Sequence, residues 1–332
     1  MSRYTEAHIS PQGPGDARPT ALQIVHDEGL EGKLRDKVIV ITGTSSGIGI
    51  ETARALASTG ARLFLTARDL TKCKTALAGF FNPDRMEIVE MDQESLESVR
   101  GAAKQILSRT NKINILINNA GIMAIQTLQF TKDGHELQFG VNHLSHFLFF
   151  QLLKPALLAG STPEFNSRVI SVSSAAHGIH GMNDSDNYNF QKGGYEPFVA
   201  YSQSKMANIY FANELERQYS SQGLHGLSVH PGEINTGLSV HLPAEFVASM
   251  SIPEALMKRI KSPEQGAATT VWAAISNEWE GRGGKYLSDV AEAVPADESK
   301  GWFFATGYSK LAYDSEKEGR VWNDSLKLVG LA

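Results

Sequence analysis

A tyrosine and a lysine stand four positions apart in the segment AYSQSK, residues 200–205. On an α-helix, side chains four residues apart point the same way, so Tyr201 and Lys205 would share one face. A phenol has a pKa of about 10 and transfers protons poorly at neutral pH. An ammonium group about 4 Å away would favour the phenolate by about 4 kcal/mol, some three pKa units. The pair therefore predicts a general acid–base near pH 7, although the same spacing is typical of a lysine that lies along an aromatic ring on a helix surface.

The composition excludes several classes of protein. The chain has 332 residues, of which 42% are hydrophobic, so it can bury a large core. The net charge is −5 and the sequence contains no basic block. The chain therefore lacks the positive patch that nucleic-acid binding requires. Cys73 is the only cysteine, which excludes an internal disulfide and fits a reducing compartment. The first 20 residues lack the apolar stretch of a signal peptide or membrane anchor, so we expect a cytoplasmic protein.

Short apolar runs alternate with longer, helix-length segments from residue 36 onward. The runs are KVIVIT (37–42), RLFLTA (62–67), MEIVEM (86–91), INILIN (113–118), RVISVS (168–173) and LSVHP (227–231). Continuous apolar runs are typical of strands buried on both faces, so the alternation predicts a doubly wound parallel α/β sheet. We expect one domain over 36–332, preceded by a loose arm over 1–35 that contains a short helix ending at Gly29.

Two further segments have simpler interpretations. Residues 146–160 are the most apolar stretch but fall short of a bilayer span, so they predict a buried helix, at a subunit interface if the protein is a homo-oligomer. His135, His143 and His146 lie close in sequence, but no acidic or cysteine partner stands at ligand spacing. We therefore predict no metal site.

Polar or glycine-rich residues follow each of the six apolar runs. In an open parallel sheet, ligands bind beyond the carboxyl ends of the strands. The first run leads into TGTSSGIG (42–49), where glycines would let the backbone approach a pyrophosphate at the start of the next helix. The predicted cofactor-binding residues of this turn are Gly43, Ser45, Ser46, Gly47, Ile48 and Gly49.

The second run is followed by Arg68, where dinucleotide enzymes that prefer NAD typically place a carboxylate. A guanidinium matches a 2′-phosphate in geometry and charge, and such a contact is worth about 1.5–3 kcal/mol, or a ten- to hundredfold preference for NADP. The alternative is an exposed arginine that pairs with Asp69 or with nothing. Asp69 could instead cap the next helix.

The third and fourth runs end in short polar segments. Asp92, followed by Gln93, could accept a hydrogen bond from an adenine amino group, cap a helix that starts near Glu94, or do both. The fourth run leads into NNAG, whose Asn119, Ala120 and Gly121 suit a backbone packed against a flat ring and equally suit a structural turn. Because all six strand ends carry such residues, with Tyr201 and Lys205 downstream, we predict one continuous site.

These motifs together resemble those of short-chain dehydrogenases/reductases of the short form. TGTSSGIG, NNAG, VNHLSHF, SVSS, YSQSK and HPG occur in the family's order within about residues 36–290. The segments ITGTSSGIG, GVNHLSHFLF, VSSAAH and GKYLSD are most similar to retinol-dehydrogenase-like and carbonyl-reductase-like members. The resemblance implies a Rossmann fold, a nicotinamide cofactor and a small-molecule carbonyl or alcohol as substrate.

The resemblance also implies roles for matched residues. Tyr201 would exchange a proton with the substrate oxygen, and Lys205 would lower its pKa and bind the nicotinamide ribose. Ser174 would hydrogen-bond the substrate oxygen, and Asn142 would hold a water that links Lys205 to solvent. The residues expected to embrace the nicotinamide are Pro231, Gly232, Ile234 and Thr236.

The chain also departs from the family pattern. Ser174 and Tyr201 are 27 positions apart, which leaves a polar loop over 177–198 that we expect at the substrate entrance. Ser46 stands where many NADP-preferring members carry a basic residue, so the preference for NADP(H) rests chiefly on Arg68, and NAD(H) stays open. The segment 237–263 would form a substrate loop, and a C-terminal extension would run from about 290. Within it, residues 302–304 (WFF) could cover an apolar substrate or pack on the core.

We therefore predict an NADP(H)-dependent oxidoreductase that interconverts a carbonyl and an alcohol on a fairly apolar small molecule, with Tyr201 as general acid–base. Two alternatives are kept. One is a catalytically silent NADP(H)-binding regulatory protein, against which the complete Asn–Ser–Tyr–Lys set argues. The other is a reductase of an activated C=C bond.

Overall fold

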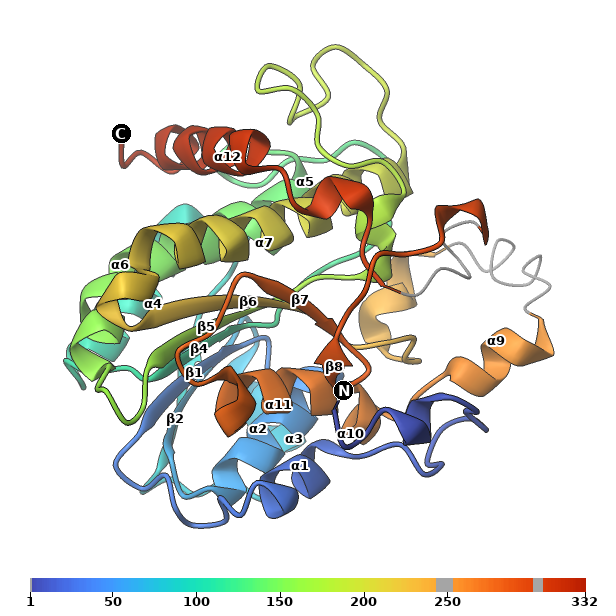
Figure 1. The fold of residues 1–332 in the computed structure, drawn as a ribbon. Helices are drawn as coiled ribbons and strands as arrows, with labels where there is room; N and C mark the ends of the chain where they lie inside the picture. Colours follow the sequence, from blue (N-terminus) through green and yellow to red (C-terminus); the bar gives the residue numbers. More distant parts are fainter. Residues whose placement is uncertain (1, 243–252, 301–306) are drawn as a thin grey trace.

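An eight-stranded sheet runs through the molecule in the computed structural model, which describes residues 2–242, 253–300 and 307–332 (Figure 1). The strand order is β3-β2-β1-β4-β5-β6-β7-β8. The strands are β1 (Val38–Thr42), β2 (Arg62–Ala67), β3 (Met86–Glu90), β4 (Ile115–Asn118), β5 (Ser167–Val172), β6 (Leu224–His230), β7 (Lys285–Ser288) and β8 (Ala291–Glu292). Neighbouring strands are parallel from β3 to β7, and β8 is antiparallel to β7. The predicted doubly wound parallel sheet is confirmed.

Helices cover both faces of the sheet (Figure 1). One face carries α1 (Ala21–Asp27), α2 (Ile48–Ser58), α3 (Leu70–Leu77), α10 (Pro263–Gly266) and α11 (Ala268–Ile275). The other carries α4 (Leu96–Leu107), α6 (Ser145–Gly160), α7 (Pro197–Tyr219) and α12 (Ser315–Leu328). The short helices α5 (Leu137–Phe139) and α9 (Glu254–Arg259) lie in connections.

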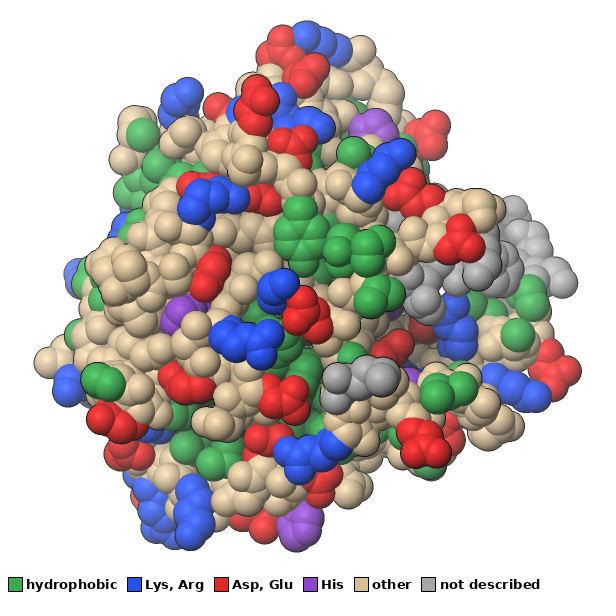
Figure 2. All heavy atoms as spheres, viewed as in Figure 1, with side chains coloured by type: hydrophobic (Ala, Val, Ile, Leu, Met, Phe, Trp, Pro, Cys, Tyr) green, Lys and Arg blue, Asp and Glu red, His purple; other side chains and the backbone are tan. Residues whose placement is uncertain are grey.

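Alternate strand residues feed two hydrophobic cores. Ile39 and Ile41 of β1 belong to the cluster beneath α1, α2 and α11, whereas Val40 belongs to the cluster beneath α4, α6 and α7. Because both faces are covered, strand residues of either parity are apolar, which is why the sequence shows continuous runs rather than alternation. Figure 2 shows lysine and arginine side chains interspersed with aspartate and glutamate on one face of the molecule.

The hairpin of β7 and β8 extends the sheet beyond the six strands that the sequence predicted. Its two turn residues, Asp289 and Val290, both have φ of 54°. A two-residue hairpin turn needs positive φ at both positions and normally selects glycine or asparagine, so a valine there gave no turn signal.

The N-terminal arm is packed against the domain, whereas the sequence suggested a loose segment. Tyr4 is 8% exposed, joins the core cluster, and donates a hydrogen bond from its hydroxyl to Asp27 Oδ2 at 2.9 Å. Arg18 is 4% exposed. A tyrosine and an arginine thus anchor a segment whose glycines and prolines suggested no fixed structure.

The apolar segment over 146–160 lies in α6 and is buried, as predicted. Its cover is a helix of the same chain: the Trp322 ring of α12 lies 5.0 Å from the Phe147 ring and 5.9 Å from the Phe211 ring of α7. Within the described ranges, no helix combines the length and apolar character needed to cross a bilayer.

Candidate active site

A cavity of about 650 Å³ opens at the carboxyl edge of the sheet. Its wall contains the glycine-rich turn after β1, the segments after β2, β3 and β4, Ser174 after β5, the loop after β6, and Tyr201 and Lys205 of α7. Every predicted catalytic and cofactor-binding residue lines this cavity except Asn142. Chain segments more than 190 positions apart thus form one site.

Two glycines of the glycine-rich turn are packed too closely for any side chain. A Cβ on Gly49 would lie 2.2 Å from the Gly43 carbonyl oxygen, and one on Gly43 would lie 2.7 Å from Ala120 Cβ. Gly47, with φ of 61°, precedes α2 and provides no side chain to cap it. The first N–H groups of α2 are therefore left for an anion, so the turn fits the pyrophosphate of a dinucleotide.

Arg68 lines the cavity but is already in an ion pair. Its Nη1 lies 2.8 Å from Glu94 Oε1, and its side chain is 71% exposed. Asp69 is not its partner: it caps α3, where Oδ1 accepts a hydrogen bond from Lys72 N at 2.9 Å. A 2′-phosphate would have to compete with Glu94 for the guanidinium.

Asp92 does not cap the following helix, which corrects one of its predicted roles. That helix, α4, begins at Leu96 and has Ser95 as its N-cap. Asp92 instead accepts hydrogen bonds from Glu94 N at 3.1 Å and from Lys132 Nζ at 2.7 Å. The capping signal was misassigned because serine and aspartate, three positions apart, are both good N-cap residues.

Asn142 lies behind the cavity wall in a π-helical turn over Gly140–Leu144. Its Nδ2 donates to the Ile122 carbonyl oxygen and to Ser204 Oγ, both at 2.9 Å, and its Oδ1 accepts from Ile122 N at 2.8 Å. The side chain therefore fixes the segment after β4 against α7. Its predicted water-holding role stays a prediction.

Tyr201 and Lys205 project from α7 into the cavity, and each is 3% exposed. The Lys205 ammonium lies 5.6 Å from the centre of the Tyr201 ring and donates to the Val172 carbonyl oxygen at 3.1 Å. The Ser174 hydroxyl is close enough to the Tyr201 phenol to affect its pKa. The serine, phenol and ammonium expected from the sequence thus meet at one point.

The acidity of Tyr201 differs from the sequence expectation. Burial raises the pKa of Tyr201 to about 12, and the Ser174 hydroxyl offsets only part of that rise. Burial also lowers the pKa of Lys205 to about 8. A phenol pKa near 7 would require a solvated ammonium close to the hydroxyl. Both groups are buried here, and desolvation disfavours both charged forms.

His177 contacts the backbone of Ser174, although sequence reasoning gave it no role. Its Nε2 accepts a hydrogen bond from Ser309 N at 3.0 Å, so its Nδ1–H donates to the Ser174 carbonyl oxygen at 2.6 Å. Burial lowers the pKa of His177 to about 4, which keeps the ring neutral. The histidine in VSSAAH was the only available signal, and its partner lies 132 positions away.

Apolar side chains form part of the cavity wall. They come from the segment after β4, the loop before α7 and the first turn of that helix, and the predicted substrate loop: Ile122, Ile179, Phe198, Leu238, Val240 and Leu256. Both loops expected at the substrate entrance therefore contribute. Residues 243–252 of the substrate loop and the aromatic segment 302–304 lie outside the described residues.

The clustered histidines have other partners. His143 Nε2 lies 2.8 Å from Ser325 Oγ, and His146 Nε2 lies 2.9 Å from Thr42 Oγ1. In the part of the chain that the structure describes, no three histidine, cysteine, aspartate or glutamate side chains gather as metal ligands would.

Comparison with known proteins gives the same family as the motifs. A family model described as short chain dehydrogenase matches residues 37–245. The chain is 48% identical over 330 residues to short-chain dehydrogenase/reductase prx1 of Penicillium roqueforti, covering 99% of this chain and 96% of the relative. It is 35% identical to human retinol dehydrogenase 13 (Homo sapiens), covering 89% of this chain and 85% of that protein.

Solved structures agree with the fold. A putative uncharacterized protein from Mycobacterium paratuberculosis is 31% identical and superposes with a TM-score of 0.69 over 95% of this chain and 98% of its own. The RhlG/NADP active-site complex from Pseudomonas aeruginosa is 25% identical, with a TM-score of 0.60 over 76% of this chain and 94% of its own. The chain belongs to the short-chain dehydrogenase/reductase family of oxidoreductases.

Proposed function

We propose that the protein is an NADP(H)-dependent oxidoreductase that interconverts a ketone or aldehyde and an alcohol on a fairly apolar small molecule. The observation that carries this proposal is the single cavity that joins an uncapped glycine-rich turn to Ser174, Tyr201 and Lys205. A dinucleotide that binds along this cavity supplies a hydride from its nicotinamide ring.

The side chains opposite the glycine-rich turn supply what a hydride transfer still needs. Ser174 and Tyr201 offer hydroxyl donors to a carbonyl oxygen, which would stabilise its developing negative charge. With its pKa raised to about 12, Tyr201 is protonated at neutral pH and can give that oxygen a proton during reduction. Lys205 lies beneath the phenol, and its ammonium would then favour the phenolate that is left.

Arg68 supports NADP(H) over NAD(H). Its guanidinium lines the cavity beyond β2, where the adenosine ribose lies in this fold. RhlG, with which this chain shares 25% identity, was solved with NADP. Because Glu94 already pairs with Arg68, the preference should be modest, and NAD(H) should bind measurably.

An apolar substrate is supported by the apolar part of the cavity wall. Ile122, Phe198 and Leu256 line the same cavity as Tyr201. Apolar walls with a few fixed polar groups are typical of sites that orient small apolar ligands.

Tyr201→Phe tests the proposal. The variant should lose turnover of NADPH with a panel of ketones and aldehydes by at least about a thousandfold, because the proton donor is missing. Its dissociation constant for NADPH, measured by fluorescence titration, should stay within about twofold of wild type. Product analysis by NMR with an α,β-unsaturated carbonyl in the panel distinguishes the allylic alcohol from the saturated carbonyl, which have the same mass.

Three outcomes would overturn the proposal. Near-normal turnover in Tyr201→Phe would remove the tyrosine from the mechanism. NADPH binding without turnover of any carbonyl would indicate the silent binding protein, and a saturated carbonyl as product would indicate the C=C reductase.

A further inference from the structure

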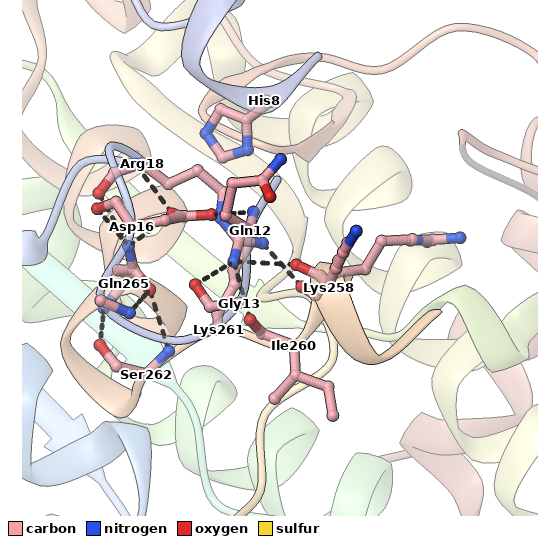
Figure 3. Close-up of polar contacts among 12 residues, drawn as sticks. His8, Gln12, Gly13, Asp16, Arg18, Lys258, Ile260, Lys261, Ser262 and Gln265 are labelled. Carbon is pink, nitrogen blue, oxygen red and sulfur yellow. Dashed lines mark hydrogen bonds and ion pairs between the residues drawn. The ribbon is translucent and has the colours of Figure 1, made fainter. Parts of the chain in front are cut away.

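The N-terminal arm contacts the far end of the substrate loop, more than 240 positions away in the chain. Figure 3 shows this contact, in which Arg18 and Asp16 of the arm meet the segment from Lys258 to Gln265. We define this segment, from the start of α9 to the middle of α10, as the return segment (254–265). It includes Leu256, which lines the apolar wall of the active-site cavity.

Arg18 occupies the C-terminal end of α9. Its Nη1 donates to the Arg259 carbonyl oxygen at 2.6 Å, and its Nη2 donates to that of Ile260 at 2.7 Å. The last carbonyls of a helix lack partners within the helix and carry partial negative charge, so a buried guanidinium satisfies both their geometry and their charge. The Asp16 carboxylate holds the guanidinium in place through Nε at 2.8 Å.

Gln265 forms a second contact with the arm. Its Nε2 donates to the Asp16 and Arg18 carbonyl oxygens at 3.1 and 3.0 Å, and its Oε1 accepts from Gly15 N at 3.0 Å. The same Oε1 accepts from Ser262 N, which closes the capping box of α10. One buried amide thus joins the arm, the return segment and the helix that follows it.

The return segment in turn pairs with the loop expected to hold the nicotinamide. Lys261 N donates to the Glu233 carbonyl oxygen at 2.8 Å, and Lys261 Nζ donates to the Pro231 carbonyl oxygen at 3.3 Å. Lys261 Nζ also pairs with Asp289 at 2.7 Å, and Asp289 lies 3.3 Å from Nδ1 of His8 in the arm. The contacts from arm to return segment to nicotinamide loop are therefore continuous.

The arm also lines a second cavity that adjoins the first. This cavity measures about 220 Å³, and its wall includes His8 and Arg18 of the arm together with His230 and Gly232. His230 and Gly232 line the active-site cavity as well. His230 and Gly232 thus lie between the arm and the active-site cavity.

We propose that residues 15–18 of the N-terminal arm are part of the substrate-binding apparatus, and that Arg18 is a positioning residue that fixes the return segment and thereby the wall around Leu256. We call the hydrogen bonds of Arg18 to the return segment the clamp. Its expected effect on catalysis rests on the proposed function, whereas its effect on the mobility of the return segment does not. Without the guanidinium, the α9 carbonyls lose their donors and the return segment gains freedom to move away from the cavity.

Hydrogen–deuterium exchange of the full-length protein tests the clamp directly. Arg18→Ala should raise the exchange rate of peptides that cover the return segment by about ten- to hundredfold, the factor expected for lost charge-assisted hydrogen bonds. Arg18→Lys keeps the positive charge but loses the two-nitrogen geometry of the guanidinium, and should raise the exchange rate by an intermediate factor. Arg3→Ala is the matched control, because Arg3 belongs to the same arm but pairs with Glu28 of the α1 end.

Steady-state kinetics test the consequence. Arg18→Ala should raise the KM for the carbonyl substrate by about tenfold or more, while the dissociation constant of NADPH changes by less than about threefold. Arg3→Ala should leave both unchanged.

Each result is decisive. Unchanged exchange in the return segment of Arg18→Ala, or an equal increase in Arg3→Ala, would overturn the clamp. If Arg18→Ala does not fold, Asp16→Asn replaces it as the test. This variant keeps the shape of the side chain but weakens its hydrogen bond to the guanidinium, so exchange in the same peptides should increase by a smaller factor. No increase in Asp16→Asn would overturn the proposal. A wild-type protein that turns over no carbonyl would refute the proposed function. The comparison of exchange in Arg18→Ala and Arg3→Ala would still test whether Arg18 fixes the return segment.

Discussion

Lys205 is a buried cation whose charge costs the folded state free energy. Its pKa is lowered to about 8 by burial, against about 10.4 in an unfolded chain. Below pH 8 both states are protonated, and the folded state bears the full cost, about 3 kcal/mol. Between pH 8 and about 10.4 the unfolded state binds more protons, so this contribution makes stability rise with pH.

Lys205→Met should therefore stabilise the protein in the absence of cofactor. The Val172 carbonyl oxygen keeps a donor, Asn208 Nδ2 at 3.1 Å, so little hydrogen bonding is lost. Urea unfolding at pH 7 should show a variant more stable by about 1–3 kcal/mol, and this gain should shrink by about 1 kcal/mol at pH 9. A variant less stable than wild type at pH 7 would show that the buried ammonium does not lower the free energy of unfolding.

Arg68 and Glu94 make a second prediction at the scale of residues. Arg68→Ala should weaken NADPH binding about tenfold or more and leave NADH binding nearly unchanged, because only NADPH carries the 2′-phosphate. Glu94→Gln removes the competing negative charge, whose oxygen lies 2.8 Å from the guanidinium, and should tighten NADPH binding by a few-fold. Isothermal titration with both dinucleotides checks the pair, and an equal loss of both in Arg68→Ala would contradict a phosphate contact.

At this scale the sequence predicted which residues meet but not their charge states. Tyr201, Lys205 and Ser174 line one cavity because helical spacing and strand ends determine where they lie. The phenol pKa was wrong because spacing says nothing about burial. The Arg68–Glu94 pair was missed because it joins the ends of two different strand–helix connections.

At the scale of elements, two glycine substitutions should act in opposite directions. Gly49→Ala would place its Cβ 2.2 Å from the Gly43 carbonyl oxygen, and should destabilise the protein by about 3 kcal/mol or more. Gly101→Ala lies on the exposed face of α4 with no atom within 4 Å, and should stabilise it by about 0.5–1 kcal/mol. Thermal unfolding of both variants checks the comparison, and a tolerated Gly49→Ala would show that the turn is not closely packed.

Element boundaries could be predicted where the local signal was strong. The starts of five parallel strands fell within two residues of expectation, because apolar runs bounded by polar segments mark them. The start of α4 was missed by two residues, since both Asp92 and Ser95 can cap a helix. The β7–β8 hairpin was missed because Asp289 and Val290 give no turn signal.

At the scale of the whole molecule, α12 completes the core over α6 and α7. Trp322 is 4% exposed and packs on Phe147, Phe150 and Phe211. Trp322→Ala should cost about 3–5 kcal/mol of stability through the cavity it leaves. Denaturant unfolding measures this loss, while NADPH affinity, set at the other edge of the sheet, should serve as the unchanged control. A loss below about 1 kcal/mol would mean that the α6–α7 face needs no cover.

The two chain ends were the least predictable parts of the molecule. Arg18 and Trp322 each contact partners from 111 to 242 positions away, and no local pattern encodes such pairings. Composition suggested a loose N-terminal arm because glycine and proline carry no periodicity, and it gave the C-terminal extension no role. The central part of the fold could be predicted from sequence because each strand and helix is marked by a local pattern. The positions of the two ends depend on the surface that the folded domain presents to them.

The hydrogen bond between Ser309 N and His177 has a consequence for biosynthesis. A ribosome synthesises Ser174, Tyr201 and Lys205 well before Ser309 and Trp322. Until the later residues leave the ribosome, His177 lacks its Ser309 partner and the apolar surface of α6 and α7 lacks its Trp322 cover. The support behind Ser174 and the burial of that surface therefore wait for Ser309 and α12, and chaperones should bind chains stalled before α12 emerges more than chains stalled after it.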